Sequence, residues 1–145
     1  SIEVSREEVK HSMMYVRERK RGGFTIIELL IVIAIIAILA AVAIPALLRA
    51  QKSGKESAAL QVLKSLHNAE QTFKVRSTAN PKTFGTLDEL KADGSSPVGE
   101  DEVEPASGYT FASEGVTTDT YTIIATPPKT DMITYTLNET GAVTP

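Results

Sequence analysis

The chain has 145 residues, a formal charge of −3 and 42% hydrophobic residues, which allows one modest domain beside a membrane segment. It has no cysteine, so disulfides, zinc–thiolate sites and cysteine nucleophiles are excluded. Residues 1–23 carry a net charge of +2 and residues 24–145 a net charge of −5, and this acidic remainder argues mildly against nucleic acid as its main partner.

A basic cluster and two glycines precede a long apolar run. Residues 19–21 are all basic and residues 22 and 23 are both glycine. The 25 residues from Phe24 to Leu48 are then polar only at Thr25 and Glu28. A helix that spans a membrane needs about 20 such residues. Because Lys and Arg before a span stay in the cytoplasm, the sequence predicts a transmembrane helix with the C-terminal part outside.

Three positions in this helix need an explanation. Glu28 is an acidic residue in an apolar stretch, and such a residue costs about 2.5–3.5 kcal/mol at a membrane centre and less toward an end. We therefore expect a compensating partner. Pro45 lacks the amide donor and clashes with the preceding turn, so it predicts a kink or a local opening. Gly54 is a second soft point, since glycine costs about 1 kcal/mol relative to alanine.

The helix is expected to continue to about Arg76, with an amphipathic second half. An apolar stripe recurs at helical spacing at Ala59, Val62, Leu63, Leu66, Ala69 and Phe73. The solvent side is expected to hold Lys55, Lys64, Glu70 and Lys74. At 1.5 Å per residue, the whole helix would be roughly 80 Å long. A domain of this size does not need such a helix, so much of it must pack elsewhere.

The remaining residues predict a short helix and a small antiparallel sheet. Pro81 follows the long helix, and Thr86 and Glu89 have the spacing of a capping box for a helix to about Ala92. Residues 93–108 have the composition of a loop. Period-two alternation then predicts three strands, at Tyr109/Phe111, at Tyr121/Ile123/Ala125 and at Ile133/Tyr135/Leu137. A turn is predicted at Glu139–Gly141 and an edge strand at Ala142–Thr144.

The residues around Gly23 resemble the class III signal of type IV prepilins and pseudopilins. They read Gly-Phe-Thr-x-x-Glu before a long apolar run. The resemblance implies cleavage between Gly23 and Phe24, N-methylation of Phe24, and an assembly role for Glu28, the fifth residue of the mature chain. It also implies that the region of Pro45 melts when subunits move from the bilayer into a filament.

The same resemblance divides the chain into three parts. Residues 1–23 would be a leader, with translation starting at Met13 or Met14. Residues 24–54 would be an apolar transmembrane and assembly helix, and residues 55–145 a globular pilin head. The expected fold class is α+β, in which the second half of the long helix packs on a small antiparallel sheet.

Two charged clusters are candidates for further sites. Oxygen ligands suited to calcium occur at Asp93, Glu100, Asp101, Glu102 and Glu104. Their spacing matches no loop motif, so a solvated loop is the favoured interpretation. Cations lie near one helical face at Arg49, Lys52 and Lys55. They suit anionic head groups or the acidic loops of a neighbouring subunit, with a plain interfacial anchor set favoured.

No catalytic constellation is visible in the sequence. There is no Ser/His/Asp set, no pair of catalytic carboxylates, no Gly-rich phosphate loop and no basic patch with stacking aromatics. His67 is a lone histidine on the flank of the long helix and is given no role. We therefore expect no enzyme activity, no cofactor and no metal.

The expected function is that of a type IV pilus subunit, assembled into a homo-oligomeric filament for adhesion, twitching motility or DNA uptake. Its expected partners are prepilin peptidase, the inner-membrane pilus assembly machinery and, before assembly, the membrane. The precursor would lie in the bacterial inner membrane and the mature protein in the extracellular pilus. The alternative is a pseudopilin of a type II secretion system, whose calcium-loop and proline-rich signatures were not found. A membrane-anchored ligand-binding domain is less favoured, because it leaves the position of Glu28 without a reason.

Overall fold

The computed structural model of the chain describes residues 22–79, 81–99 and 102–145. The chain divides into two compact units, Ser1–Leu39 and Ala40–Pro145. The predicted leader, including Met13 and Met14, lies outside the described residues except for Gly22 and Gly23.

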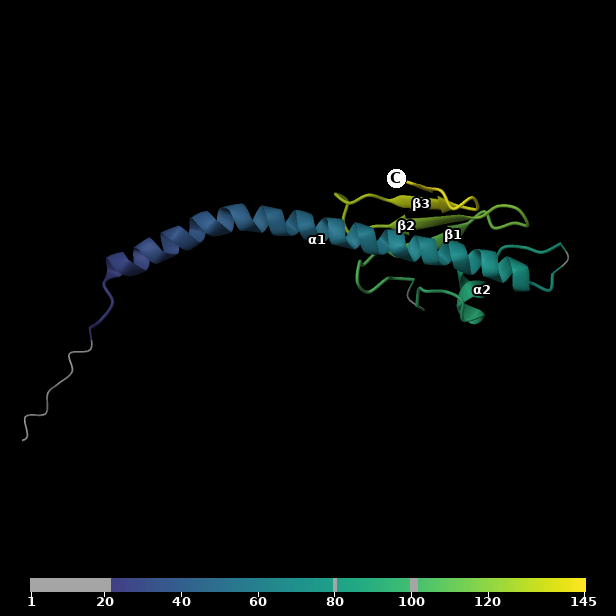
Figure 1. Ribbon diagram of the computed structural model, residues 1–145, viewed down its shortest axis with the longest axis horizontal. Helices are drawn as coiled ribbons and strands as arrows, with labels where there is room; N and C mark the ends of the chain where they lie inside the picture. Colours follow the sequence, from purple (N-terminus) through teal and green to yellow (C-terminus); the bar gives the residue numbers. More distant parts are fainter. Residues whose placement is uncertain (1–21, 80, 100–101) are drawn as a thin grey trace, which may run out of the picture. The chain divides into compact units, whose positions relative to one another are not determined.

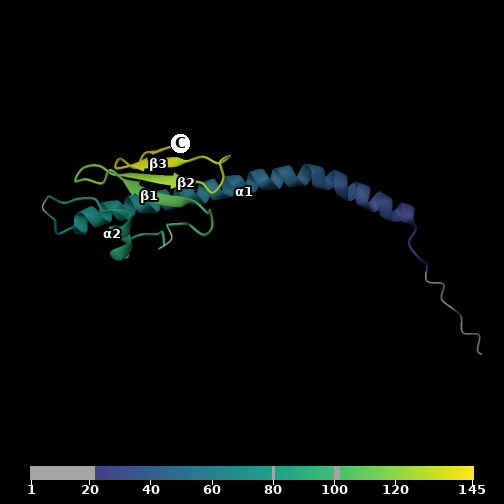
Figure 2. The ribbon, with the colours of Figure 1, turned by 180° about the vertical axis from the view of Figure 1, so that it is seen from behind.

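Helix α1 runs from Ile26 to Arg76, which confirms the predicted long helix (Figures 1 and 2). It begins two residues after Phe24 because Thr25 lies outside the helix and caps it. The helix continues through Pro45 without ending. A proline inside a helix removes one backbone hydrogen bond, but the neighbouring bonds can hold the helix together.

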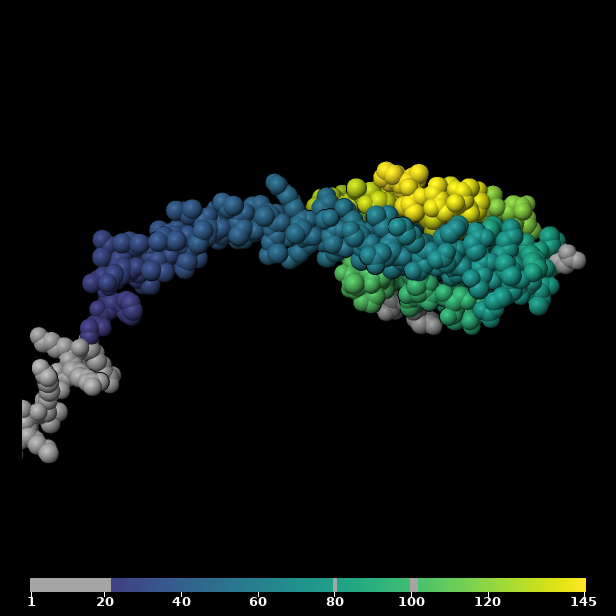
Figure 3. All heavy atoms as spheres, in the orientation of Figure 1, coloured from purple at the N-terminus to yellow at the C-terminus, as the bar shows by residue number. Residues whose placement is uncertain are grey.

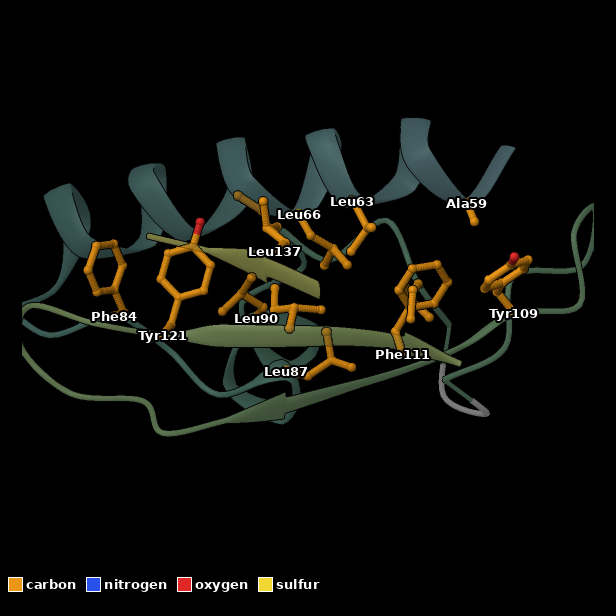
Figure 4. Packing of buried hydrophobic residues seen from close by; sticks show 14 of the residues in the cluster. Ala59, Leu63, Leu66, Phe84, Leu87, Leu90, Tyr109, Phe111, Tyr121 and Leu137 are labelled. Atoms are coloured by element: carbon orange, nitrogen blue, oxygen red, sulfur yellow. The ribbon is translucent and has the colours of Figure 1, made fainter. Parts of the chain in front are cut away.

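The second half of α1 packs against the sheet through its apolar stripe (Figure 4). In the stripe, Ala59, Leu63, Leu66 and Ala69 are buried, while Val62 and Phe73 are half-buried. Burying a leucine contributes about 1.5–3 kcal/mol, so this stripe is a main source of stability for the second unit. The facing core residues are Tyr109, Phe111, Tyr121, Ile123, Ala125 and Leu137 of the sheet region, with Leu87 and Leu90 of α2 (Leu87–Ala92).

The sheet is an antiparallel meander of four strands in chain order. These strands are β1 (Thr110–Glu114), β2 (Thr122–Thr126), β3 (Tyr135–Asn138) and β4 (Val143–Thr144). The register places Phe111 beside Ala125 and Ile123 beside Leu137, and all four are buried. The α+β class is therefore confirmed. Gly141, with φ of +79°, forms the predicted turn before β4 and donates its N–H to the Asn138 carbonyl at 3.0 Å.

The two edges of the sheet are short or covered. Strand β4 has only two residues. Beside β1, the Glu104 N–H donates to the Tyr109 carbonyl at 3.0 Å, and the Phe111 N–H donates to the Glu102 carbonyl at 2.9 Å. At the other end of β1, the Leu87 N–H donates to the hydroxyl of Ser113 at 3.0 Å. The two backbone contacts cover the outer edge of β1 near its start, and the bond to Ser113 ties the start of α2 to the other end of the strand.

Among the predicted strand residues, Tyr109, Tyr121 and Ala142 each precede their strand by one residue, and Ile133 lies two residues before β3. Strand β3 begins at Tyr135, and Ile133 is 42% exposed. The cause is a turn before the strand, in which the Met132 N–H donates to the Lys129 carbonyl at 3.2 Å. The turn brings Met132 into the core instead. The prediction that Ile133 faces the core was therefore wrong.

The prediction that Glu70 lies on the solvent side was also wrong. Glu70 is fully buried, because it follows Leu66 by four residues and so lies on the apolar stripe. Its Oε2 accepts the Gly85 N–H at 3.0 Å, and Oε1 has no partner among the described residues. A Cβ on Gly85 would stand 2.6 Å from Leu90 Cδ1, so no side chain fits there.

The hydrogen bond from the Gly85 N–H to Glu70 anchors the chain immediately before α2. The residue after Gly85 is Thr86, the N-cap of α2. Thr86 and Glu89 form both reciprocal bonds of a capping box, which confirms the helix predicted from their spacing. One buried carboxylate on α1 therefore fixes where the second helix begins.

We predict that the second unit loses stability as pH rises, because of Glu70. Burial, with a smaller contribution from the charge of Glu89, raises the pKa of Glu70 to about 7, and the bond from Gly85 opposes this only in part. Since the folded-state pKa lies above the ordinary value of 4.5, the stabilisation is complete below pH 4.5 and is lost as pH rises through 7. The expected loss is about 3 kcal/mol of unfolding free energy.

The measurement is urea unfolding of the full chain in detergent, followed by tyrosine circular dichroism from pH 4.5 to 8. Glu70→Gln should flatten the pH dependence and exceed the wild type in stability at pH 8. Glu114→Gln, at an exposed position on β1, is the matched control and should retain the wild-type dependence. Equal pH dependence in Glu70→Gln and wild type would contradict the assignment.

Candidate functional site

The segment before α1 is held by reciprocal hydrogen bonds between Thr25 and Glu28. Oε2 of Glu28 accepts the Thr25 N–H at 2.8 Å and the Thr25 hydroxyl at 2.9 Å, and the Glu28 N–H donates to Thr25 Oγ1 at 3.2 Å. This is a capping box, in which the first and fourth residues satisfy each other's backbone donors. It also places the carboxylate in the first turn, where the helix dipole favours negative charge.

Thr25 is a residue of the candidate site that the sequence predictions omitted. Its signal was present, because Thr25 and Glu28 have the same Thr-x-x-Glu spacing that predicts the capping box of α2. In this apolar context the free-energy cost of burying Glu28 is the more prominent signal. The structure identifies a partner for Glu28 within the chain, as the physical argument required.

Gly22 and Gly23 stand in open surroundings beside the exposed side chain of Phe24. A Cβ built on either glycine would meet no heavy atom within 4 Å, and neither residue has the positive φ that favours glycine. Phe24 is 94% exposed. The chain's own packing therefore does not require glycine at position 23, and a requirement must come from something that binds this segment.

The apolar run of α1 exposes its large side chains around the whole helix. Figure 3 shows one face of this helix with all its heavy atoms. The large apolar residues from Ile26 to Leu48 are 51–80% exposed. The helix is long and apolar enough to cross a membrane. A helix that is hydrophobic all round needs a lipid or protein environment, so this run must be covered by something other than the described chain.

The other predicted assembly residue, Pro45, does not meet the capping box. It lies in the second compact unit, whereas Glu28 lies in the first. The structure therefore gathers Gly23, Phe24, Thr25 and Glu28 at the start of α1 and leaves Pro45 as a separate feature.

The acidic residues considered for calcium have separate partners where they are described. Glu102 lies 3.1 Å from Lys91 Nζ, and Asp93 lies 3.2 Å from the Arg76 guanidinium. Glu104 accepts backbone N–H groups two and three residues on, which lower the pKa of its carboxyl although burial opposes them. Glu100 and Asp101 lie outside the described residues. Within residues 22–79, 81–99 and 102–145, no three acidic, histidine or cysteine side chains are grouped to hold a metal ion.

His67 has a packing contact in the second unit. Its Nδ1 lies 2.6 Å from the hydroxyl of Tyr121, a buried core residue. A Cβ on Gly141 would stand 3.1 Å from its Nε2, so the ring fits closely under the turn before β4.

Residues 19–44 match the family model of the prokaryotic N-terminal methylation motif. No curated protein and no solved structure matched the chain. The chain thus carries a prepilin class III signal followed by an apolar helix. These findings support a prepilin-processed protein of the type IV pilin or pseudopilin kind, with a membrane-anchored precursor.

We predict that Gly23→Val slows processing by about 100-fold, the loss that a misplacement of about 1 Å can cause in an enzyme's substrate. The substitution meets no atom of the chain itself, so α1 and membrane insertion should be unchanged. Intact-mass measurement of the purified protein checks both the processed fraction and the new N-terminus, which should be Phe24 with one methyl group.

Gly22→Val is the matched control, because its Cβ also stands in open space. It should be processed far better than Gly23→Val. A mature chain that retains Gly23, or normal processing of Gly23→Val, would show that the cut is elsewhere.

Proposed function

We propose that this protein is the structural subunit of a type IV pilus. The precursor is held in the inner membrane by residues 24–54, cut between Gly23 and Phe24, and methylated on the new amine of Phe24. Subunits then leave the membrane and assemble through α1 into a surface filament that displays the heads, residues 55–145. The filament serves adhesion, twitching motility or DNA uptake, and the subunit itself performs no catalytic step.

The placement of Glu28 is the observation that supports this proposal most. A single carboxylate stands in the first turn of α1, at the start of a run whose large apolar side chains, from Ile26 to Leu48, are all exposed. Thr25 satisfies it in part, and both of its bonds from Thr25 reach the same oxygen, Oε2. A cation can therefore approach Oε1 without breaking the capping box.

Processing would supply that cation. Cleavage at Gly23 creates an amine on Phe24, four positions before Glu28. Phe24 precedes the first residue of α1, so helical i, i+4 spacing does not by itself bring its amine to Glu28 of the same chain. Between staggered copies, the amine of one chain can reach Glu28 of the next. Removal of one partner of a buried ion pair typically costs about 3–5 kcal/mol. Glu28 is thus proposed to select and register neighbouring subunits.

We predict that Glu28→Gln strongly reduces fibres while leaving cleavage and the fold of the head intact. Glutamine also serves as the fourth residue of a capping box, so this variant removes the charge and keeps the helix start. The measurement is fibre yield after shearing, by electron microscopy and by quantifying the sheared protein. Co-expression with the wild type should restore part of the yield.

Thr25→Val is the complementary control, because it removes the capping hydroxyl and keeps the charge of Glu28. Loss of a cap costs about 1 kcal/mol, so fibres should be reduced much less. Normal fibre yield from Glu28→Gln would contradict the assembly role. Short periplasmic assemblies that require calcium, in place of surface fibres, would indicate the secretion pseudopilin instead.

We also predict that α1 near Pro45 is less ordered in the filament than in the membrane-held subunit. The reason is the missing donor at Pro45, with Gly54 as a second soft point. Hydrogen exchange on filaments and on detergent-held subunits measures this. Pro45→Ala should increase protection and reduce assembly without abolishing it. A fully protected helix around Pro45 in wild-type filaments would contradict the prediction.

A further inference from the structure

A pocket of about 130 Å³ lies in the second unit between α1 and the connection from β2 to β3. Its walls include three lysines from these two elements, Lys52 and Lys55 of α1 and Lys129 of the connection. Leu48 and Met132 supply apolar surface. We refer to this feature as the lysine pocket.

The charges of the lysine pocket favour an anion. Asp131 is the carboxylate among its lining residues. Lys52 Nζ donates to the carbonyl oxygen of Asp131 and lies 3.9 Å from its Oδ2, and this contact holds the lysine in place. The Asp131 side chain is itself 70% exposed. The lining residues therefore carry three positive charges and one negative charge, a formal net charge of +2. The net charge of the whole chain is negative.

The position of the lysine pocket along α1 points to the membrane surface. Leu48 is the last residue of the apolar run and is more than half exposed. Lys52 and Lys55 follow it by four and seven residues, a rise of roughly 6 and 10 Å. The headgroup layer of a bilayer extends about 5–8 Å beyond the hydrocarbon on each side. Lys52 thus comes at the depth of the lipid head groups when Leu48 stands at the edge of the hydrocarbon. The Cα of Lys55 lies about 3 Å beyond this layer, and its long side chain can reach back to it.

We propose that the lysine pocket binds the phosphate group of an anionic phospholipid in the outer leaflet of the inner membrane. Leu48 contacts the first carbons of the lipid, while Lys52, Lys55 and Lys129 surround its phosphate. Because Lys129 lies on the connection from β2 to β3 and Lys52 and Lys55 lie on α1, the lipid holds the head at one orientation on the membrane before assembly. The proposal rests on the membrane-anchored stage of the proposed function and not on filament formation.

The test uses the full chain in lipid nanodiscs that hold one copy each, made of phosphatidylcholine alone or with phosphatidylglycerol. Amide hydrogen exchange of residues 129–132, which follow Pro127 and Pro128, is the readout. Each cation near an anionic surface contributes about fivefold to binding, so exchange should slow by at least about fivefold with phosphatidylglycerol. Lys129→Glu should remove this slowing. Lys64→Glu, the same charge change at an exposed position of α1, should retain it.

Four results would overturn the proposal. These are equal exchange in the two lipids, slowing that survives Lys129→Glu, equal slowing by inorganic phosphate in phosphatidylcholine discs, and slowing only when a disc holds two copies. The third would assign the site to free phosphate and the fourth to carboxylates of a neighbouring chain. Failure of α1 to insert into either lipid would instead refute the membrane-anchored stage itself.

Discussion

The first half of α1 is apolar on every side, and the described chain buries none of it in its most apolar stretch. This single constraint governs the rest of the molecule. A helix with one apolar stripe can be satisfied by packing on one partner, but a helix that is apolar all round must be surrounded. Lipid meets this requirement for a subunit in the membrane. Outside the membrane, several copies of the same helix are the environment that resembles it most.

Two carboxylates of α1, Glu28 in its first half and Glu70 in its second, are stabilised differently. Glu28 stands in the first turn, where free backbone donors and the helix dipole are available, and Thr25 completes a capping box. Glu70 stands in the middle of a packed face, where the N–H of Gly85 is its one donor among the residues that the structure describes. The first arrangement leaves the charge accessible to a partner, while the second favours the protonated form.

Much of the fold could be predicted because local signals were strong and agreed with one another. The apolar period of α1, the capping box at Thr86 and the alternation around Phe111 and Ile123 each specify one element. The signal at Gly23 and Phe24 was equally clear, since the motif is long and specific. Its role in processing stays a prediction that the structure alone does not test.

The wrong predictions concern residues whose burial is decided by tertiary contacts. Glu70 has the polarity of a surface residue and the spacing of a core residue, and spacing prevailed because a partner N–H was available. Ile133 continues the alternation of β3, but a turn shifts Met132 into the core. Lys129 carried no signal in the sequence, because it meets Lys52 and Lys55 only after the sheet folds against α1.

The edges of the sheet have a consequence for the proposed filament, in which identical heads would lie side by side. Exposed strand edges template pairing between molecules, and such crowding would promote amyloid-like fusion. Here β4 offers two residues, and the outer side of β1 is paired near its start by the chain's own backbone. Neighbouring copies can therefore touch through side chains while remaining separable, a property that any reversible polymer needs.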